Sequence, residues 1–252
     1  MNTLISVLLL YVFNSLHKDT YAIIAQYILE HIENMDKLSI DKLAYACGTS
    51  PNTINKFCKE MGLENYKALK SMLSNTVEGR KEQITKRYNN FDIDQFYTRI
   101  GLNDHREEFD ECMNSVVDLI HDANYIYMIG AVYPLSLTLN FVEDMILFGN
   151  HFRIKQIGFK DDRYDYQEND LIFLITITGR IMTLNRPYFR ELNKKKVKKI
   201  AISQNYFIND LFDFDEFIQL IDTHHSEIEN CILIEILNYI KLLYFNKYVN
   251  NK

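Results

Sequence analysis

The residues best suited to chemistry lie in one short stretch, LAYACGTSPNTINKFCKEMG, residues 43–62. Amide and ammonium side chains recur there at helical spacing, and the face they form holds no carboxylate. A helix that faces only solvent usually mixes Glu with Lys, because i,i+4 pairs stabilise it. Amides can bond base edges and ammonium groups can neutralise phosphates, so this face predicts a helix in the major groove of DNA. The predicted DNA contacts are Ser50, Asn52, Thr53, Asn55, Lys56 and Lys59, with Tyr66 and Lys67 as phosphate contacts.

Two helices joined by a tight turn are expected to position that face. Ser39 can cap the first helix, and Gly48 can end it with a positive φ. Ser50 can cap the second helix, with Pro51 at its first position. The expected buried stripes are Ile40, Leu43, Ala44 and Cys47 in the first helix, and Ile54, Phe57, Cys58 and Met61 in the second. A two-helix corner of an ordinary helical protein has a similar pattern, but cap, turn and carboxylate-free face together favour DNA binding.

Residues 35–73 resemble the N-terminal helix-turn-helix domain of the RpiR family of bacterial transcription regulators. The resemblance implies a DNA-binding domain. Arg is the commonest family residue at the position of Lys56. An ammonium group there would contact DNA as a single point charge, without the bidentate hydrogen bonds of a guanidinium. The matching positions are Ser39-Ile40, Leu43-Ala44, Ser50, Lys56-Phe57, Met61-Gly62-Leu63, Tyr66 and Leu69-Lys70.

Charge is divided unevenly along the chain of 252 residues, whose net charge is −6. Residues 1–90 carry 11 Lys and Arg against 9 Asp and Glu, a net of +2, whereas residues 91–252 carry 17 against 25, a net of −8. Because +2 is weak for a DNA-binding surface, we expect affinity to depend on local placement and on two copies acting together, as a homodimer or homotetramer. The four cysteines form no C-x-x-C pair, which predicts reduced core residues in a cytoplasmic protein.

The N-terminal run LISVLLLYVF, residues 4–13, is apolar but too short to span a membrane, and no membrane association is expected. It predicts a helix that packs on the core of the first domain or against a partner subunit. We place a helix-turn-helix domain at residues 1–78 and a linker or connecting helix at residues 79–104. The basic residues Arg80, Lys81, Lys86 and Arg87 are expected to be solvated there.

Residues 105–252 follow a different pattern, in which short apolar runs alternate with helical stretches. This predicts an α/β domain with a parallel sheet flanked by helices, so the expected fold is an all-α domain followed by an α/β domain. A long striped helix closes the chain. The expected strands lie in NYIYMIG, HFRIKQI, NDLIFLITITG, VKKIAIS and EFIQLID.

This second part resembles the sugar isomerase (SIS) domain that usually accompanies the RpiR helix-turn-helix. The resemblance implies a phosphorylated-sugar site in two loops, which usually read Gly-x-Gly-x-Ser and Ser-x-Ser-Gly. This chain has GAVYP at residues 130–134 and TITGR at residues 176–180, so both loops are altered. The threonines keep an oxygen but could instead cap the next helix. The candidate ligand residues are Gly130, Thr176, Thr178, Gly179, Arg180 and Thr183.

An enzyme is the alternative, either a phosphosugar isomerase or an aminosugar-processing enzyme with an appended helical domain. It needs a base beside the sugar carbon, but His224, His225 and Glu227 form only a short cluster before the last helix. Adjacent histidines do not share a helix face, so we expect no metal, no cofactor and no catalytic residue. A helical oligomerisation module is a third possibility. The leading prediction is a DNA-binding transcription regulator of sugar or aminosugar metabolism.

Overall fold

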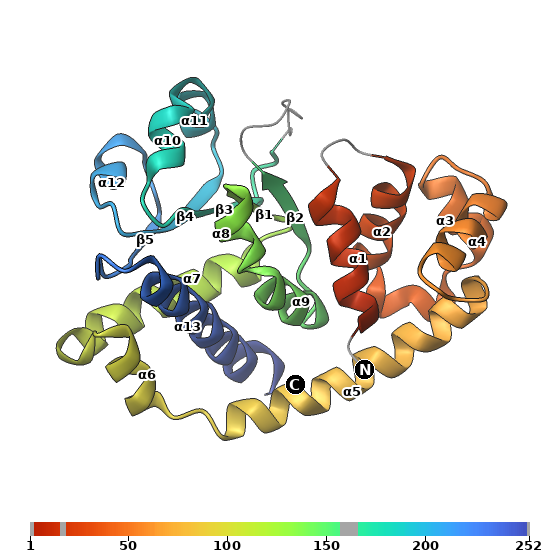
Figure 1. The fold of residues 1–252 in the computed structure, drawn as a ribbon, viewed down its shortest axis with the longest axis horizontal. Coiled ribbons are helices and arrows are strands. Elements are labelled where there is room, and N and C mark those ends of the chain that lie inside the picture. Colours follow the sequence, from red (N-terminus) through yellow and green to blue (C-terminus); the bar gives the residue numbers. More distant parts are fainter. Residues whose placement is uncertain (1–2, 16–18, 157–165, 251–252) are drawn as a thin grey trace. The chain divides into compact units, whose positions relative to one another are not determined.

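The computed structural model in Figure 1 describes residues 3–15, 19–156 and 166–250. The chain divides into two compact units. Unit 1 comprises Met1–Asn90 with Glu143–Gly149, and unit 2 comprises Phe91–Val142 with Asn150–Lys252. The fold class expected from the sequence is confirmed, because a helical N-terminal region precedes a parallel sheet flanked by helices.

Unit 1 is built from helices that follow one another closely along the chain. The last of them, α5, is a single helix of 24 residues that continues into residues 79–104, the segment expected to be a linker or a connecting helix. Among the described residues, no helix is long and apolar enough to cross a membrane. The helices are α1 (Thr3–Asn14), α2 (Thr20–Glu30), η1 (Ile32–Lys37), α3 (Ile40–Ala46), α4 (Pro51–Glu60) and α5 (Tyr66–Asn89).

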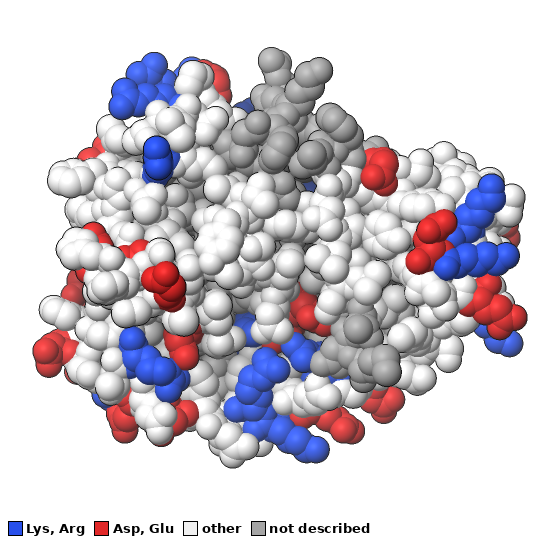
Figure 2. All heavy atoms as spheres, viewed as in Figure 1, with Lys and Arg blue, Asp and Glu red and all other residues white. Residues whose placement is uncertain are grey.

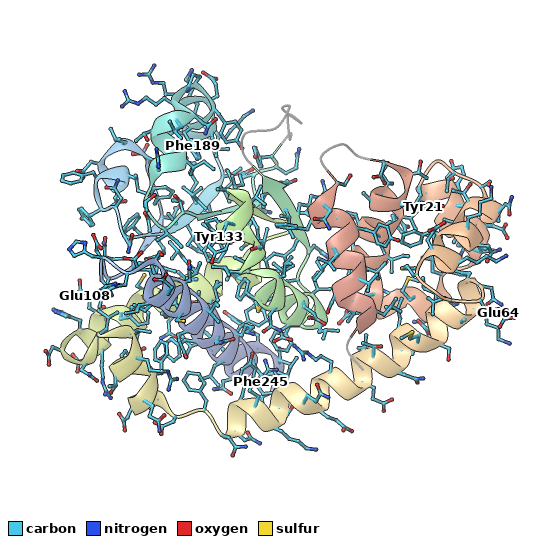
Figure 3. The ribbon with its side chains drawn as sticks, viewed as in Figure 1. Tyr21, Glu64, Glu108, Tyr133, Phe189 and Phe245 are labelled. Atoms are coloured by element: carbon cyan, nitrogen blue, oxygen red, sulfur yellow. The ribbon has the colours of Figure 1, made fainter. Side chains whose placement is uncertain are left out.

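The apolar N-terminal run forms α1, which packs against α2 and α5 within unit 1. This is the first of the two placements expected for it. An aromatic cluster then joins α1 and α2 to α4. The ring centroid of Phe57 lies 5.2 Å from those of both Tyr11 and Tyr21, and Tyr21 is labelled in Figure 3. Such pairs add stability beyond their buried area, so they fix the position of α4. The buried apolar residues of α1 are Leu4, Ile5, Leu8, Leu9 and Phe13.

A buried ion pair also lies in unit 1. Asp144, from the part of α9 that belongs to this unit, is inaccessible to solvent, and its Oδ1 lies 2.7 Å from Arg80 Nη2. Arg87 Nη1 lies 3.3 Å from the other oxygen of the same carboxylate. The prediction that Arg80 is solvated is wrong, because only 5% of the residue is exposed. Asp144 supplies the opposite charge that a buried guanidinium needs.

Unit 2 centres on a five-stranded sheet in the order β2-β1-β3-β4-β5, with every neighbouring pair parallel. All residues of the central strands β1 and β3 are buried, as expected of a sheet covered on both faces. Each strand lies within one of the five segments predicted to contain a strand. The strands are β1 (Ile126–Gly130), β2 (Phe152–Gln156), β3 (Leu171–Ile175), β4 (Lys198–Ser203) and β5 (Glu216–Gln219).

Helices cover both faces of this sheet. On one face, alternate strand residues such as Ile129 and Leu174 pack with residues of α10, α11 and α12. On the other face, Phe141 of α9 packs edge to face on Phe173 of β3. The sequence pattern did not predict the short helices that follow β1, β3 and β4. The helices that precede or follow the strands are α7 (Arg106–Asp122), α8 (Val132–Ser136), α9 (Leu139–Leu147), α10 (Arg180–Leu184), α11 (Arg186–Asn193), α12 (Phe207–Leu211), α13 (Ser226–Tyr244) and η3 (Phe245–Val249).

Residues expected to belong to the connecting segment form a helix of unit 2, α6 (Ile93–Ile100), followed by η2 (Asn103–His105). The rings of Phe96 on α6 and Tyr239 on α13 stack with their centroids 4.4 Å apart. The Asp110 carboxylate of α7 accepts hydrogen bonds from Tyr97 and Tyr239, the latter at 2.6 Å. These contacts join α6, α7 and α13 into one layer.

Candidate nucleic-acid interface

The helix-turn-helix predicted from the sequence forms as α3 and α4. Ser39 Oγ accepts a hydrogen bond from the Lys42 N–H at 3.3 Å and caps α3. Gly48 has a φ of 60°, a left-handed conformation that glycine adopts without strain. Ser50 Oγ accepts from the Thr53 N–H at 3.2 Å, and Pro51 occupies the first turn of α4. Both predicted caps and the predicted turn are therefore confirmed.

The two faces of α4 differ as the sequence predicts. Ile54, Phe57 and Cys58 are buried, and Met61, just after the helix, is half-buried. Burial raises the pKa of the Cys58 thiol to about 11, so this cysteine is neutral at physiological pH. The four cysteines are all free thiols, but Cys231 is exposed, which corrects the expectation that all belong to the core.

The opposite face of α4 presents Asn52, Lys56 and Lys59, all exposed. Near its start, the hydroxyl groups of Ser50 and Thr53 lie 3.0 Å apart. Exposure leaves the amide and the two ammonium groups able to meet a ligand without any rearrangement of the core. The interface that the structure brings together is therefore one helix face with a polar N-terminus.

Two predicted contact residues, Asn55 and Tyr66, are engaged inside unit 1. Asn55 Oδ1 accepts a hydrogen bond from the Tyr66 N–H at 3.1 Å, which ties the start of α5 to α4. Tyr66 is only 7% exposed and donates its hydroxyl to the Leu38 carbonyl at 3.0 Å. Burial raises the Tyr66 pKa to about 12, so the phenol keeps its proton. We therefore assign Asn55 and Tyr66 positioning roles, whereas Lys67 is exposed.

Two further residues that were not among the predicted DNA contacts are Tyr45 and Lys70. Tyr45 on α3 is 89% exposed, which is unusual for a large aromatic side chain. The Lys70 ammonium on α5 donates to the Asp36 carbonyl at 2.6 Å and to the Leu38 carbonyl at 3.2 Å. The helical spacing in the sequence already places Tyr45 outside the expected buried stripe of its helix, so its exposure could have been predicted. The partners of Lys70 lie more than thirty positions away, and no local pattern reports them.

Charge on the helix-turn-helix is mixed. Figure 2 shows basic and acidic side chains interspersed over α3 and α4, at the right of the view. This agrees with the small net charge of residues 1–90. On the face shown, basic side chains therefore do not form a continuous patch over these two helices.

The candidate ligand loops of unit 2 lie where β1 and β3 end. These strands are neighbours, with Gly130 paired to Ile175. After β1 the chain crosses to β2 on one side of this pair, and after β3 it crosses to β4 on the other side. Such a switch point is where open parallel sheets usually bind ligands. A Cβ at Gly130 would lie 2.5 Å from the Ile175 carbonyl oxygen, so close strand packing requires this glycine. Gly130 therefore has a structural reason to be glycine, independent of any ligand.

The threonines of the second loop bond to the loop itself. Thr176 Oγ1 accepts from the Gly179 N–H at 3.1 Å, and Thr178 Oγ1 accepts from the Arg180 N–H at 3.4 Å. Thr183 donates its hydroxyl to the Arg180 carbonyl at 2.8 Å. The loop thus has the self-capped arrangement expected as the alternative to phosphate binding. The exposed Arg180 is the residue of this set best placed to pair with an anion.

The residues weighed for an enzyme lie just before α13 and in its first turn. His224 is 87% exposed and its Nδ1 lies 3.1 Å from Asp222 Oδ1. Tyr133, labelled in Figure 3, accepts a hydrogen bond from Asn230 Nδ2 on α13 at 3.0 Å. Within the described part of the chain, no group of His, Cys, Asp and Glu could hold a metal ion.

Comparison with known proteins identifies the first domain. Residues 16–79 match the family model for the helix-turn-helix domain, rpiR family. The chain is 26% identical over 125 residues to the HTH-type transcriptional regulator HexR of Pseudomonas aeruginosa, a match covering 46% of this chain and 44% of HexR. It is 24% identical over 186 residues to the HTH-type transcriptional regulator GlvR of Bacillus subtilis, covering 71% of this chain and 69% of GlvR.

One solved structure with a similar fold is the sugar isomerase domain of an RpiR transcription factor from Sphaerobacter thermophilus. It is 10% identical in sequence, with a TM-score of 0.47, and the match covers 68% of this chain and 92% of that one. The resemblance of residues 35–73 to the RpiR helix-turn-helix is confirmed by the family model.

Proposed function

We propose, because residues 16–79 match the family model for the helix-turn-helix domain of the rpiR family, that this protein is a sequence-specific DNA-binding transcription regulator. The observation that carries the proposal is the exposed face of α4, which presents Asn52, Lys56 and Lys59. In this proposal α4 enters the major groove. Asn52 and Lys56 contact base edges, and Lys59 and Lys67 contact phosphates.

Two copies of the chain are part of the proposal. The net charge of +2 on residues 1–90, from 11 basic and 9 acidic residues, gives one copy little general attraction for DNA. A homodimer places two copies of α4 on two half-sites, and the second contact then forms at high effective concentration. We assign dimerisation to unit 2, which takes the place and the fold class of an SIS domain.

A phosphorylated sugar is the effector class that we propose for unit 2, in keeping with control of sugar or aminosugar metabolism. The supporting observation is Arg180, an exposed guanidinium beside the switch point between β1 and β3. Arg180 can pair with a phosphate bidentately, while the threonine-capped loop holds its backbone in place. A ligand that favours one dimer geometry would change the spacing of the two α4 helices and so the affinity for DNA.

Fluorescence-anisotropy titration tests this function. The full-length protein is titrated onto the DNA upstream of its own coding region and onto scrambled DNA, with and without a panel of sugar phosphates. The expected result is tighter binding to the upstream DNA, and a shift in affinity with one sugar phosphate supports the effector class. The double variant Asn52→Ala, Lys56→Ala should lose at least about tenfold in affinity at an unchanged Tm, since each base contact contributes about 1–3 kcal/mol.

The matched control is Asn89→Ala, Lys86→Ala, which removes the same two side-chain types from exposed positions near the end of α5. It should bind the upstream DNA as the wild type does. Equal binding by the α4 double variant and the wild type would remove α4 as the reader of DNA.

A further inference from the structure

An open groove of about 510 Å³ lies in unit 1, between the segment that leads into α3 and the first half of α5. Its apolar lining comes from Leu38, Ile40 and the ring of Tyr66, and polar side chains surround these residues. Apart from the phosphate contact assigned to Lys67, the function proposed above does not use this groove. Its position matters because Asn55 of α4 accepts a hydrogen bond from the backbone N–H of Tyr66 at 3.1 Å, so the groove adjoins α4.

The walls of the groove are fixed by hydrogen bonds. Tyr66 donates its hydroxyl across the groove to the Leu38 carbonyl at 3.0 Å. The Lys70 ammonium bonds the same carbonyl at 3.2 Å and the Asp36 carbonyl at 2.6 Å. An ammonium group has three N–H donors, so two bonds hold Lys70 in place and leave one donor for a ligand. The cation is therefore already oriented in the free protein.

The remaining polar groups suit an anion with several oxygens. Lys67 and Lys70 give the groove two positive charges against the single negative charge of Asp36. Ser71 and Ser74 lie three positions apart on α5 and add hydroxyl donors from exposed positions. Ammonium and hydroxyl donors around one site match the three acceptor oxygens of a phosphate group.

We propose that this groove binds a backbone phosphate of DNA while α4 lies in the adjacent major groove. The inference rests on the proposed function and adds a second anchor to it. A phosphate held by Lys67 and Lys70 carries no sequence information, but it fixes the register in which α4 meets the bases. Asn55 and Tyr66 act as positioning residues, because their bonds set the distance between this anchor and α4.

Salt dependence of DNA binding tests the groove. A fluorescein-labelled duplex of random sequence is titrated with the full-length protein over a series of salt concentrations. Lys67→Ala should reduce the slope of log affinity against log salt by about 0.9, the value for one lost phosphate contact. Ser71→Glu, which places a carboxylate in the groove, should weaken binding at every salt concentration. Lys86→Ala is the matched control, because it removes one exposed lysine from the same helix outside the groove.

The outcomes separate this inference from the proposed function. If the wild type binds the upstream DNA more tightly than scrambled DNA and the α4 double variant loses that preference, the proposed function stands. An unchanged slope for Lys67→Ala, or an equal fall for Lys86→Ala, would then overturn the groove and the phosphate contact of Lys67, while α4 would remain the reader of DNA. Inorganic phosphate should leave the Tm of the wild type unchanged. A rise in Tm with inorganic phosphate that disappears in Lys67→Ala would assign the groove to a free anion and overturn its assignment to DNA.

Discussion

At the scale of single residues, exposure separates the side chains that can reach DNA from those that hold the domain together. Asn52 and Asn55 are three positions apart on α4, yet one is exposed and the other accepts a hydrogen bond from the start of α5. Sequence spacing places both on the polar side of the helix. It does not report the neighbour that packs against part of that side, because α5 comes from residues further along the chain.

Tyr66 gives a prediction that distinguishes a positioning role from a phosphate contact. Tyr66→Phe removes the hydrogen bond to the Leu38 carbonyl and should cost about 0.5–1.5 kcal/mol of unfolding free energy. The Lys70 ammonium still bonds that carbonyl, which keeps the cost near the lower end. The salt slope of DNA binding should be the same as in the wild type, because no phosphate contact is lost. Chemical denaturation measures the free energy of unfolding, and anisotropy titration measures the salt slope. A smaller slope for the variant would mean that Tyr66 does contact a phosphate.

At the scale of elements, the sequence predicted those whose signals are local. Ser39, Gly48, Ser50 and Pro51 determine the ends of α3 and α4 through bonds within a few residues, so caps and turn could be placed in advance. The five strands were predicted from signals of the same local kind, because each lies in a short segment rich in β-forming residues. Short helices such as α10 depend on packing against the sheet and carry too few residues for a periodic pattern.

The burial of Arg80 could not be predicted from the sequence, because its partner Asp144 is 64 positions away. Asp144→Asn removes the charge but keeps the shape, and leaves Arg80 buried without an anion. Breaking a buried ion pair in this way should cost about 3–5 kcal/mol. Asp94→Asn is the control, because Asp94 is 79% exposed in its pair with Arg106, and such surface pairs contribute about 0–1 kcal/mol.

Urea denaturation followed by circular dichroism measures both variants. The Asp144 variant should show a clearly lower midpoint than the Asp94 variant. Similar midpoints for the two would mean that the buried pair contributes no more than an exposed one, and that solvent reaches Arg80 in the variant and compensates for the missing carboxylate.

At the scale of the whole molecule, the two units divide the chemistry of the chain. Basic and amide groups for DNA lie in unit 1, while the acidic excess and the parallel sheet lie in unit 2. For the candidate effector loops, the sequence alone did not decide between two roles. Their residue types allowed either a phosphate site or a capped turn, and only the hydrogen bonds of Thr176 and Thr178 showed the loop to be self-capped.

Selection of DNA from a random-sequence library by the full-length protein tests the central claim most directly. The wild type should enrich one motif, with two related half-sites if a dimer binds. The Asn52→Ala, Lys56→Ala variant should lose that motif or relax it at the bases α4 contacts, whereas Asn89→Ala, Lys86→Ala should enrich the wild-type motif. Enrichment of the same motif by the α4 variant, or of no motif by a folded wild type, would contradict the assignment of α4 as the element that reads DNA.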